Sequence, residues 1–407
     1  MNALGLIVEY NPFHNGHFYH LQEAKKKSEA ELAIAVMSGN FLQRGEPAMV
    51  SKWTRTEMAL RSGVDVVVEL PYAYATQRAD QFAFGAVAIL DALLCRRIIF
   101  GSESGEIEPF LNTVSFIEQN ERMYNERIQA QIQSGLSYPS AASRAFLEIP
   151  ERPETTVDLS KPNNILGFHY INAIRKLNSS IIPETIKRTG AGYHDKENTS
   201  NTIASATGIR SKLIEHQEPL SSISELVPPA TNDSLTKHLS AYQQFQSWEK
   251  YFPLLKYRLF TSTPSELSSI YECVEGLENR LLDLIKESES FHDFLNSVKT
   301  KRYTWTRLQR LCTHILTNTH KSVMEKATLS GPSYVRLLGM SPTGQQYLSQ
   351  IKKKMALPLV STVSQHDDPL IELDMRATKT YILGFPSDCH STLWKQEYST
   401  PPLRHQI

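Results

Sequence analysis

The stretch GLIVEYNPFHNGH, residues 5–17, decides the fold of this chain. It begins as a short apolar run, turns at Asn11-Pro12, and continues into a stretch with helical periodicity at residues 17–28. A buried strand that leads directly into a helix is the first half of a strand–helix–strand crossover. The pattern therefore predicts a parallel sheet covered by helices.

The same alternation continues over the first hundred residues and returns once later. Strands are predicted at residues 4–9, 31–38, 64–70, 97–100 and 180–189, and helices at residues 17–28, 52–62 and 78–94. Short β-branched runs between helical periods are typical of the α/β class. We therefore expect a Rossmann-like parallel sheet.

The composition of the chain changes after Glu218. Several prolines and serines predict a linker at residues 219–240. Amphipathic helical periods dominate the chain beyond it. We therefore expect an α/β catalytic domain at residues 1–218 and a mostly helical C-terminal domain at residues 241–407.

The overall charge excludes some classes of protein. Lys and Arg total 43, and Asp and Glu also total 43. A balanced charge argues against a protein that coats nucleic acid, although it leaves room for a local basic patch. No apolar stretch approaches the roughly 18–20 residues that a membrane helix needs, and the first residues lack the pattern of a secretory signal. We expect a cytoplasmic protein that does not contact a membrane.

The turn after the first strand carries a phosphate-binding pattern. His14 and His17 flank Gly16 where the following helix begins. Unpaired N–H groups and the positive end of the dipole favour phosphate at a helix N-terminus, and glycine lets the backbone approach a ligand closely. Imidazole N–H donors there can stabilise charge on a departing pyrophosphate. We predict that both histidines are catalytic.

A second candidate element is TIASATGIR, residues 202–210. Taken alone, its serine and threonines are typical of a helix N-cap. Together with the histidine turn, the hydroxyls of Ser205 and Thr207 predict contacts to phosphate, and Arg210 predicts neutralisation of the leaving group. We therefore include Arg210 among the catalytic residues.

These motifs carry a resemblance to known enzymes. The HxGH turn resembles the signature of the nucleotidyltransferase superfamily. The wider set YNPFHNGH, MSGNFLQRGEPAMVSKWTRTEMAL, VDVVVELP, PNNILG and IASATGIR resembles bacterial tRNA(Met) cytidine acetate ligases over nearly the whole chain. The resemblance implies that ATP and acetate form acetyl-adenylate, and that the acetyl group then passes to N4 of the wobble cytidine of elongator tRNA(Met).

The resemblance also implies an ATP site. Asn163 alone would be a helix cap, and Arg188 alone a solvated charge. Asn11 stands where many superfamily members carry an aspartate, so the ligands of the expected Mg²⁺ remain unknown. The ATP-binding set implied by the resemblance is Ile7, Val8, Asn11, Pro12, Phe13, His14, Gly16, His17, His20, Gly39, Gly101, Asn163, Arg188, Ser205 and Thr207.

An RNA substrate needs a basic surface, and residues 296–326 offer one. Seven basic residues there stand against the single acid Glu325, with two aromatic residues among them. Basic side chains can contact phosphates and aromatic rings can stack on unpaired bases, although a solvated helix face is the alternative. The predicted RNA-binding set is Lys299, Lys301, Arg302, Tyr303, Trp305, Arg307 and Arg310.

Two other functions remain open from the sequence. A small-molecule nucleotidyltransferase would share the histidine turn, but it would not need the helical, basic C-terminal half. A catalytically silent, nucleotide-sensing RNA-binding protein would not need His14, His17 and Arg210. The sequence does not predict an oligomeric state. Because an anticodon base must leave its loop to react, we expect an open groove between the domains.

Overall fold

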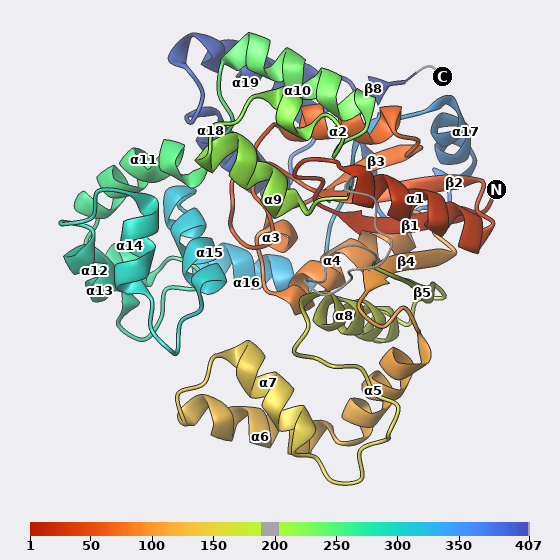
Figure 1. Cartoon of the computed structure of the whole chain (residues 1–407), viewed down its shortest axis with the longest axis horizontal. Helices are drawn as coiled ribbons and strands as arrows, with labels where there is room; N and C mark the ends of the chain where they lie inside the picture. Colours follow the sequence, from red (N-terminus) through yellow and green to blue (C-terminus); the bar gives the residue numbers. More distant parts are fainter. Residues whose placement is uncertain (189–202, 406–407) are drawn as a thin grey trace.

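Eight strands form one sheet in the computed structural model, which describes residues 1–188 and 203–405 (Figure 1). The strand order is β5-β4-β1-β2-β3-β6-β7, and β8 pairs with β6 outside this path. β1 to β5 are parallel, whereas β6 is antiparallel to β3. The strands are β1 Ala3–Val8, β2 Leu32–Ser38, β3 Val66–Leu70, β4 Arg97–Ser102, β5 Ile182–Lys187, β6 Val335–Met340, β7 Leu359–Val360 and β8 Leu403–Arg404.

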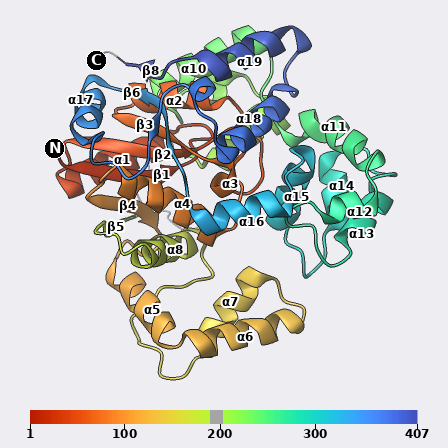
Figure 2. The same cartoon turned by 180° about the vertical axis from the view of Figure 1, so that it is seen from behind.

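Helices surround the sheet and extend from it in two places. α5 to α7 form an arm below the sheet, and α11 to α15 form a helical group to one side (Figures 1 and 2). Within the two described ranges, no helix is long and apolar enough to cross a membrane. The α-helices are α1 Asn15–Ser28, α2 Lys52–Arg61, α3 Tyr72–Ala75, α4 Ala79–Ala92, α5 Glu108–Gln119, α6 Glu121–Gln133, α7 Tyr138–Leu147, α8 Pro162–Lys176, α9 Ala206–Arg210, α10 Pro229–Tyr242, α11 Trp248–Phe260, α12 Pro264–Ser268, α13 Leu277–Leu284, α14 Phe291–Val298, α15 Trp305–Leu316, α16 Lys321–Ser330, α17 Pro342–Ile351, α18 Pro369–Ile382 and α19 His390–Ser399. The short π and 3₁₀ helices are η1 Ser211–Glu215, η2 Leu220–Ile223, η3 Val363–Gln365 and η4 Ser387–Cys389.

The sheet separates two apolar cores, because successive side chains of a strand point to opposite faces. Leu6 of β1 packs in one core with Leu21 of α1. Val36 of β2 packs in the other core with Ile89 of α4. The predicted α/β class is therefore confirmed, and the five predicted strands differ from β1 to β5 by at most two residues at either end. Thr189, the last residue of the fifth predicted strand, lies outside the described residues.

The C-terminal part of the chain returns to the sheet, which the sequence does not predict. β6, β7 and β8 lie within the predicted helical domain at residues 241–407, yet β6 pairs directly with β3. The pairing covers an apolar strand that would otherwise be an exposed edge. The short apolar run of β6 could not be told from a buried helix by its pattern. We propose that these strands belong to the α/β domain, and the boundary at residues 218–241 stays a prediction.

The predicted linker at residues 219–240 is largely helical. Pro229 occupies the first turn of α10, where proline is tolerated because its missing N–H would have no acceptor within the helix. Thr231 and Leu235 are buried, and Asp233 pairs with Arg61 of α2 at 2.8 Å. The prolines therefore mark the start of a packed helix rather than an irregular segment, and a linker at residues 219–240 stays a prediction.

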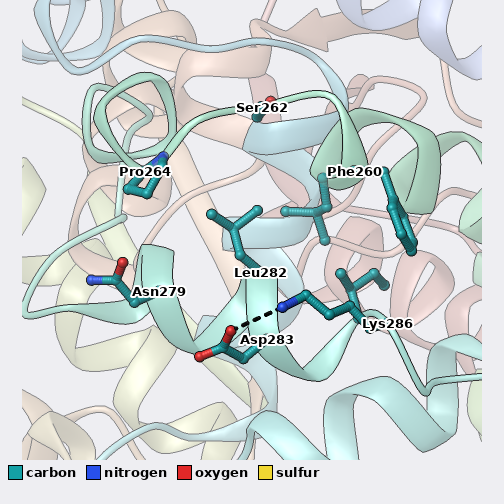
Figure 3. A pocket seen from close by; sticks show the side chains of 9 residues that line it. Phe260, Ser262, Pro264, Asn279, Leu282, Asp283 and Lys286 are labelled. Carbon is teal, nitrogen blue, oxygen red and sulfur yellow. Dashed lines mark hydrogen bonds and ion pairs between the residues drawn. The ribbon is translucent and has the colours of Figure 1, made fainter.

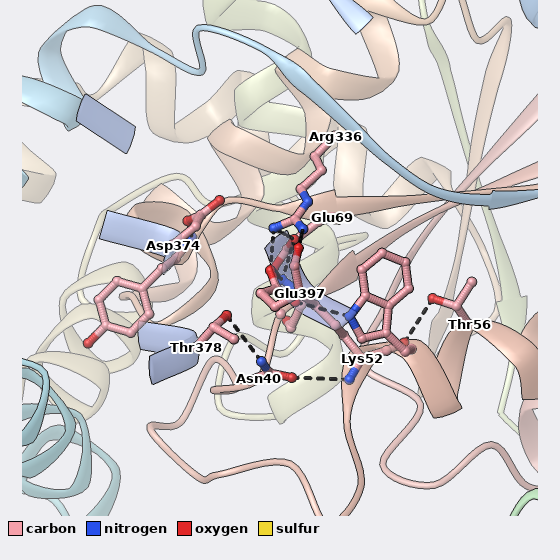
Figure 4. Close-up of polar contacts among 12 residues, drawn as sticks. Asn40, Lys52, Thr56, Glu69, Arg336, Asp374, Thr378 and Glu397 are labelled. Atoms are coloured by element: carbon pink, nitrogen blue, oxygen red, sulfur yellow. Dashed lines mark hydrogen bonds and ion pairs between the residues drawn. The ribbon is translucent and has the colours of Figure 1, made fainter. Parts of the chain in front are cut away.

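A buried cluster of four charges joins the last helix to the start of the fold (Figure 4). Lys52 of α2 lies 2.7 Å from Glu69 of β3 and 2.8 Å from Glu397 of α19. Arg336 of β6 lies 3.1 Å from Glu69 and 2.7 Å from Glu397. The indole of Trp53 donates to the same Glu397 carboxylate at 3.0 Å. Two positive and two negative charges thus compensate each other where water does not reach them.

Replacing Glu397 with alanine should be strongly destabilising. The variant leaves Lys52 and Arg336 buried with a single counter-charge, so the free energy of unfolding should fall by about 3–5 kcal/mol. Urea unfolding measures the change. The control is Glu57→Ala, which removes the half-exposed partner of Lys237 and Arg61 and should cost less than about 1 kcal/mol. Equal stability of the two variants would contradict this role for the cluster.

Candidate active site

The turn between β1 and α1 holds His14 and His17 in a reciprocal capping arrangement. The Nδ1 atom of His14 accepts a hydrogen bond from the Gly16 N–H at 3.0 Å, and the His14 N–H donates to Nδ1 of His17 at 3.3 Å. The ring centroids lie 3.8 Å apart. Because both Nδ1 atoms accept, the proton of each neutral ring resides on Nε2. The turn therefore presents two imidazoles whose Nε2–H groups can act as donors.

Gly16 is required by the position of the His14 ring. A Cβ atom at Gly16 would lie 2.8 Å from Cε1 of His14, so any side chain would displace the imidazole. The same Cβ would lie 3.7 Å from a methyl carbon of Ile203. The structure therefore brings the beginning of the second predicted motif next to the histidine turn.

The histidines of this turn are held in their neutral form. Burial, followed by the positive charges of Arg188 and Arg210, lowers the pKa of His14 to about 4. Burial and the neighbouring His14 lower the pKa of His17 well below its ordinary value. Burial and Arg188 lower the pKa of His20 to about 4, and the buried His20 Nε2 has no partner among the described residues. A neutral imidazole still offers one N–H donor, so each ring can donate one hydrogen bond to phosphate.

Arg210 connects the second motif to the histidine turn. Its guanidinium donates to the carbonyl of Asn11 at 2.9 Å and pairs with Glu46 at 3.1 Å. The hydroxyl of Ser205 caps α9 by accepting from a backbone N–H at 3.1 Å, and Thr207 lies 3.4 Å from the guanidinium. The three predicted residues thus share the site, although Thr202 of the motif lies outside the described residues.

Arg188 reaches the same place from the other side of β1. It follows β5, and its backbone N–H donates to the Ser102 carbonyl at the end of β4 at 2.9 Å. A Cβ atom at Gly101 would lie 3.1 Å from Cγ of Arg188. The glycine therefore leaves room for the arginine side chain, whose charge lowers the pKa values of His14 and His20.

Four further residues of the predicted ATP set lie at the end of β1 and within the turn. Ile7 and Val8 are half-buried at the end of β1, whereas Pro12 and Phe13 are buried. Phe13 packs its ring 5.7 Å from that of His17 and so supports the imidazole from within the core.

Three further members of the set are held by other protein groups. Asn11 accepts from the Met49 N–H at 2.8 Å through its side-chain oxygen, and its buried amide nitrogen has no partner among the described residues. Gly39 faces the Glu69 carboxylate, which a Cβ atom would approach to 2.5 Å. Asn163 is not the cap of α8 but lies in its first turn, where its amide donates to Glu103 at 2.8 Å.

Arg55 organises the strand ends beneath the site. Its buried guanidinium donates to the carbonyls of Glu9 at 2.7 Å, Ser38 at 3.0 Å and Val50 at 3.3 Å, and also to that of Gly39. Burial lowers the pKa of Arg55 to about 10, so the group stays charged at neutral pH. The sequence reasoning missed this residue because nothing in a helical period shows which arginine will reach carbonyls of two strands.

Two carboxylates near the turn were also missed. Glu9 accepts from the Gln43 N–H at 2.7 Å, and burial raises its pKa. Glu46 is the partner of Arg210. Across the described ranges, no group of three or more His, Cys, Asp or Glu side chains could hold a metal ion.

The predicted RNA-binding residues divide into exposed and buried ones. Lys299 and Lys301 are exposed, and Arg302 is half-exposed while it pairs with Glu275 at 2.8 Å. The other four take part in contacts within the protein. Trp305 donates to Gln309 at 3.1 Å, and Arg310 pairs with Glu272 at 2.9 Å. The Arg307 guanidinium lies 4.9 Å from the centre of the Tyr303 ring. The Tyr303 hydroxyl in turn donates to Glu275 at 2.7 Å.

Tyr303 and Arg310 must be removed from the predicted RNA-binding set. Both are buried, with 7% of each residue exposed, so neither presents a surface to RNA. α15, which contains Arg310, instead holds the loop that follows β2. Gln309 donates to the Arg44 carbonyl at 2.9 Å, and Thr313 donates to the Gly45 carbonyl at 2.7 Å. A charge run cannot show which of its members face the core.

We expect His14 and His20 to remain neutral down to about pH 4. An unfolded histidine takes up its proton near pH 6.5. The unfolded chain therefore binds more protons than the folded chain between these values, and the protein should lose stability as the pH falls from 6.5 to 4. Imidazole NMR titrations, assigned with His14→Asn and His20→Asn, measure the midpoints. Midpoints near 6.5 would contradict the buried, arginine-flanked geometry.

Comparisons with known proteins identify the family of this chain. The family model described as HIGH Nucleotidyl Transferase matches residues 1–396. The tRNA(Met) cytidine acetate ligase of Lysinibacillus sphaericus is 47% identical over 406 residues and is covered completely, as is this chain. That of Bacillus subtilis is 47% identical over 408 residues, which cover 100% of this chain and 98% of the relative.

Solved structures agree as well. Thermotoga maritima TmcAL without ligand has a TM-score of 0.91 at 34% identity, and both chains are covered completely. The same protein bound with alpha-thio ATP has a TM-score of 0.90 at 35% identity, again with complete coverage. This chain therefore belongs to the HIGH nucleotidyl transferase family and, within it, to the tRNA(Met) cytidine acetate ligases.

Proposed function

We propose that this enzyme activates acetate with ATP and transfers the acetyl group to N4 of the wobble cytidine of elongator tRNA(Met). The observation that carries the proposal is the pair of neutral imidazoles, His14 and His17, at the N-terminus of α1 with Arg188 and Arg210 on either side. The names of the relatives and the ATP analogue on TmcAL support it. We further propose that it acts in the cytoplasm, where tRNA is available.

The first step is adenylate formation. An acetate oxygen attacks the α-phosphorus of ATP, a new P–O bond forms, and the bond to the β-phosphate oxygen breaks as pyrophosphate leaves. The reaction needs positioning and neutralisation of charge more than a strong base. His14 and His17 would donate from Nε2 to phosphate oxygens, and the two arginines would balance the charge of the leaving pyrophosphate.

The second step is acyl transfer. The cytidine N4 nitrogen attacks the acetyl carbon, a C–N bond forms, and AMP leaves with the electrons of the broken C–O bond while N4 loses a proton. Water would hydrolyse acetyl-adenylate if it reached the intermediate, so the site must exclude it. The loop held by Arg55 and α15 lies beside the turn and is suited to this purpose.

We propose that Mg²⁺ arrives on the phosphates of ATP. Mg²⁺ commonly keeps several waters and is held by substrate phosphates with only one or two carboxylates. That behaviour fits a site whose nearby Glu46 carboxylate already pairs with Arg210. The ion would neutralise phosphate charge while the imidazoles and arginines of the chain orient the nucleotide.

The function is tested with purified protein, ATP, labelled acetate and bulk tRNA. Pyrophosphate release should depend on acetate and not require RNA, and digestion of the RNA should yield labelled N4-acetylcytidine. Turnover that depends on a phosphorylated metabolite instead would indicate a small-molecule nucleotidyltransferase. Nucleotide binding with no turnover would indicate a silent RNA-binding protein, and either result would overturn the proposal.

His17→Asn should isolate the contribution of one imidazole donor. An asparagine oxygen can still accept from the His14 N–H, so the turn should keep its fold, but the Nε2–H donor is lost. Adenylate formation should fall by about 10²–10³-fold, as for loss of one preorganised donor. The acetate-dependent exchange of pyrophosphate into ATP measures this step, and tRNA binding should be unchanged. The control is His366→Asn, at an exposed position, and equal activities would contradict the role of His17.

The exposed basic residues should contribute to tRNA affinity through phosphates. The triple variant Lys299→Ala, Lys301→Ala, Arg302→Ala should weaken tRNA binding and make it less dependent on salt, by about 0.7–0.9 in the log–log slope for each phosphate that the variant no longer neutralises. Adenylate formation should be unaffected. The matched control removes three exposed charges at residues 352–354. Normal affinity and slope in the first variant would show that the RNA lies elsewhere.

A further inference from the structure

Glu9 is the first residue after β1, at the edge of the sheet where the histidine turn begins. In parallel sheets, ligands bind beyond the carboxyl ends of the strands. The next residue, Tyr10, has a left-handed backbone with a φ of 51°, and its ring centroid lies 5.0 Å from that of His17. Glu9 therefore lies directly before the turn that carries the two imidazoles.

The two carboxylate oxygens of Glu9 have different surroundings. Oε1 accepts from the Gln43 N–H at 2.7 Å and from the Ser38 hydroxyl at 3.4 Å. Oε2 has no hydrogen-bond partner in the described structure, and it is accessible to solvent. The residue as a whole is half-buried. One oxygen is therefore held by the protein, and the other can contact a substrate.

The charged groups around Glu9 lie on the loop after β2, on α2 and on α8. Burial raises the pKa of Glu9; the charge of Glu46 adds to the rise, whereas a backbone N–H, Arg44 and Arg55 oppose it. Burial, and then the charge of Glu9, raise the pKa of Tyr170 on α8, so that hydroxyl stays neutral. A raised carboxylate pKa lies closer to neutral pH, where a base works best.

The imidazoles of the site are not available to accept a proton. Nδ1 of His14 and Nδ1 of His17 each accept from a backbone N–H, at 3.0 and 3.3 Å. Their Nε2 atoms carry the ring protons and act as donors. The Glu46 carboxylate pairs with Arg210 at 3.1 Å. Among these described groups beside the turn, Glu9 is the one with an oxygen that is free to accept a proton.

The cavity of the helical group offers no comparable carboxylate. It has a volume of about 350 Å³ and lies between α11, α12 and α13 (Figure 3). Its carboxylate, that of Asp283, pairs with Lys286 at 3.2 Å, and the Asp283 side chain is 74% exposed. A carboxylate that is already paired and solvated is a poor acceptor for a substrate proton. This cavity therefore does not supply a base.

The loop after β2 connects Glu9 to the helical group. The Gln43 side chain donates to the Gln77 carbonyl at 2.7 Å, and the carbonyls of Arg44 and Gly45 accept from α15. Arg44 is exposed, and its charge reaches Glu9. An arginine beside an accessible carboxylate offers one contact for a phosphate and one for an amine. That combination suits a nucleotide whose base has left its loop.

We infer that Oε2 of Glu9 accepts a hydrogen bond from the N4 amino group of the cytidine and takes one of its protons during acyl transfer. A carboxylate is a common partner of cytosine N4. As N4 attacks the acetyl carbon, the C–N bond forms and the C–O bond breaks with its electrons on AMP. One N4 proton passes to Glu9, which then releases it to water. The inference rests on the proposed function and adds to it the base of the second step.

Glu9→Gln tests this role. The amide oxygen can still accept from the Gln43 N–H, so the turn should keep its fold, but the side chain can no longer take a proton. Acetate-dependent exchange of pyrophosphate into ATP should be unchanged. In a single turnover, transfer of labelled acetyl from the bound adenylate to tRNA should fall by about 10²–10⁴-fold, the usual contribution of a general base. The matched control is Glu29→Gln, at the exposed end of α1, which should behave as the wild type.

Two further readouts distinguish a base from a structural residue. Hydroxylamine is a stronger nucleophile that needs no base from the protein, so it should take the acetyl group from the adenylate equally fast in Glu9→Gln and in the wild type. Wild-type transfer to tRNA should rise with pH as Glu9 loses its proton, with a midpoint above the ordinary glutamate value of 4.5. The variant should lack this rise.

The outcomes separate this inference from the proposed function. Wild-type protein that lacks acetate-dependent exchange, or that transfers no label to tRNA, would refute the proposed function. With both activities present, transfer at the wild-type rate in Glu9→Gln would overturn the inference. Equal losses of exchange, of the hydroxylamine reaction and of transfer would overturn it as well. A rate of wild-type transfer that does not change with pH would overturn it without any variant.

Discussion

The guanidinium of Arg55 gathers the carbonyl groups where β1 and β2 end. Parallel strands finish at the same edge of a sheet, and the carbonyls beyond the last paired residues need donors once they are buried. Arg55 satisfies those of Glu9, Ser38, Gly39 and Val50 together. The position at which β1 ends then determines where the next residues turn and where α1 begins. The two imidazoles depend on that position for their geometry.

The electrostatics of the site follow from burial and from the arrangement of its charges. Burial and the charge of Arg188 disfavour the protonated form of both histidines, and Arg210 adds to this effect at His14. The arginines keep their charge, so positive charge lies on both sides of a neutral pair of donors. The arginines would compensate the charge of a bound triphosphate, and the two imidazoles would donate hydrogen bonds to it. This division suits a reaction that must release pyrophosphate, because neutral imidazoles need no change of protonation to stabilise it.

The C-terminal part of the chain packs against its N-terminal part. β6 covers the edge of β3, and the buried charges of Lys52, Glu69, Arg336 and Glu397 join four elements from both ends of the sequence. α15 reaches the loop after β2, so the helical group contacts the loop beside the site. The helical group proposed to bind RNA is therefore in direct contact with the loop beside the proposed ATP site. Loss of a buried charge in the last helix would disturb the first domain.

The sequence by itself determined the elements whose pattern is local. Alternating strands and helices, the start of α1 at the histidine turn, and the hydroxyl cap of α9 each depend on residues within a few positions of one another. Only the tertiary structure decided which distant groups meet. It placed Arg188 beside His14, returned β6 to the sheet, and buried Tyr303 and Arg310. Those outcomes depend on packing between segments hundreds of residues apart, and a side chain's burial is a property of that packing rather than of its neighbours in sequence.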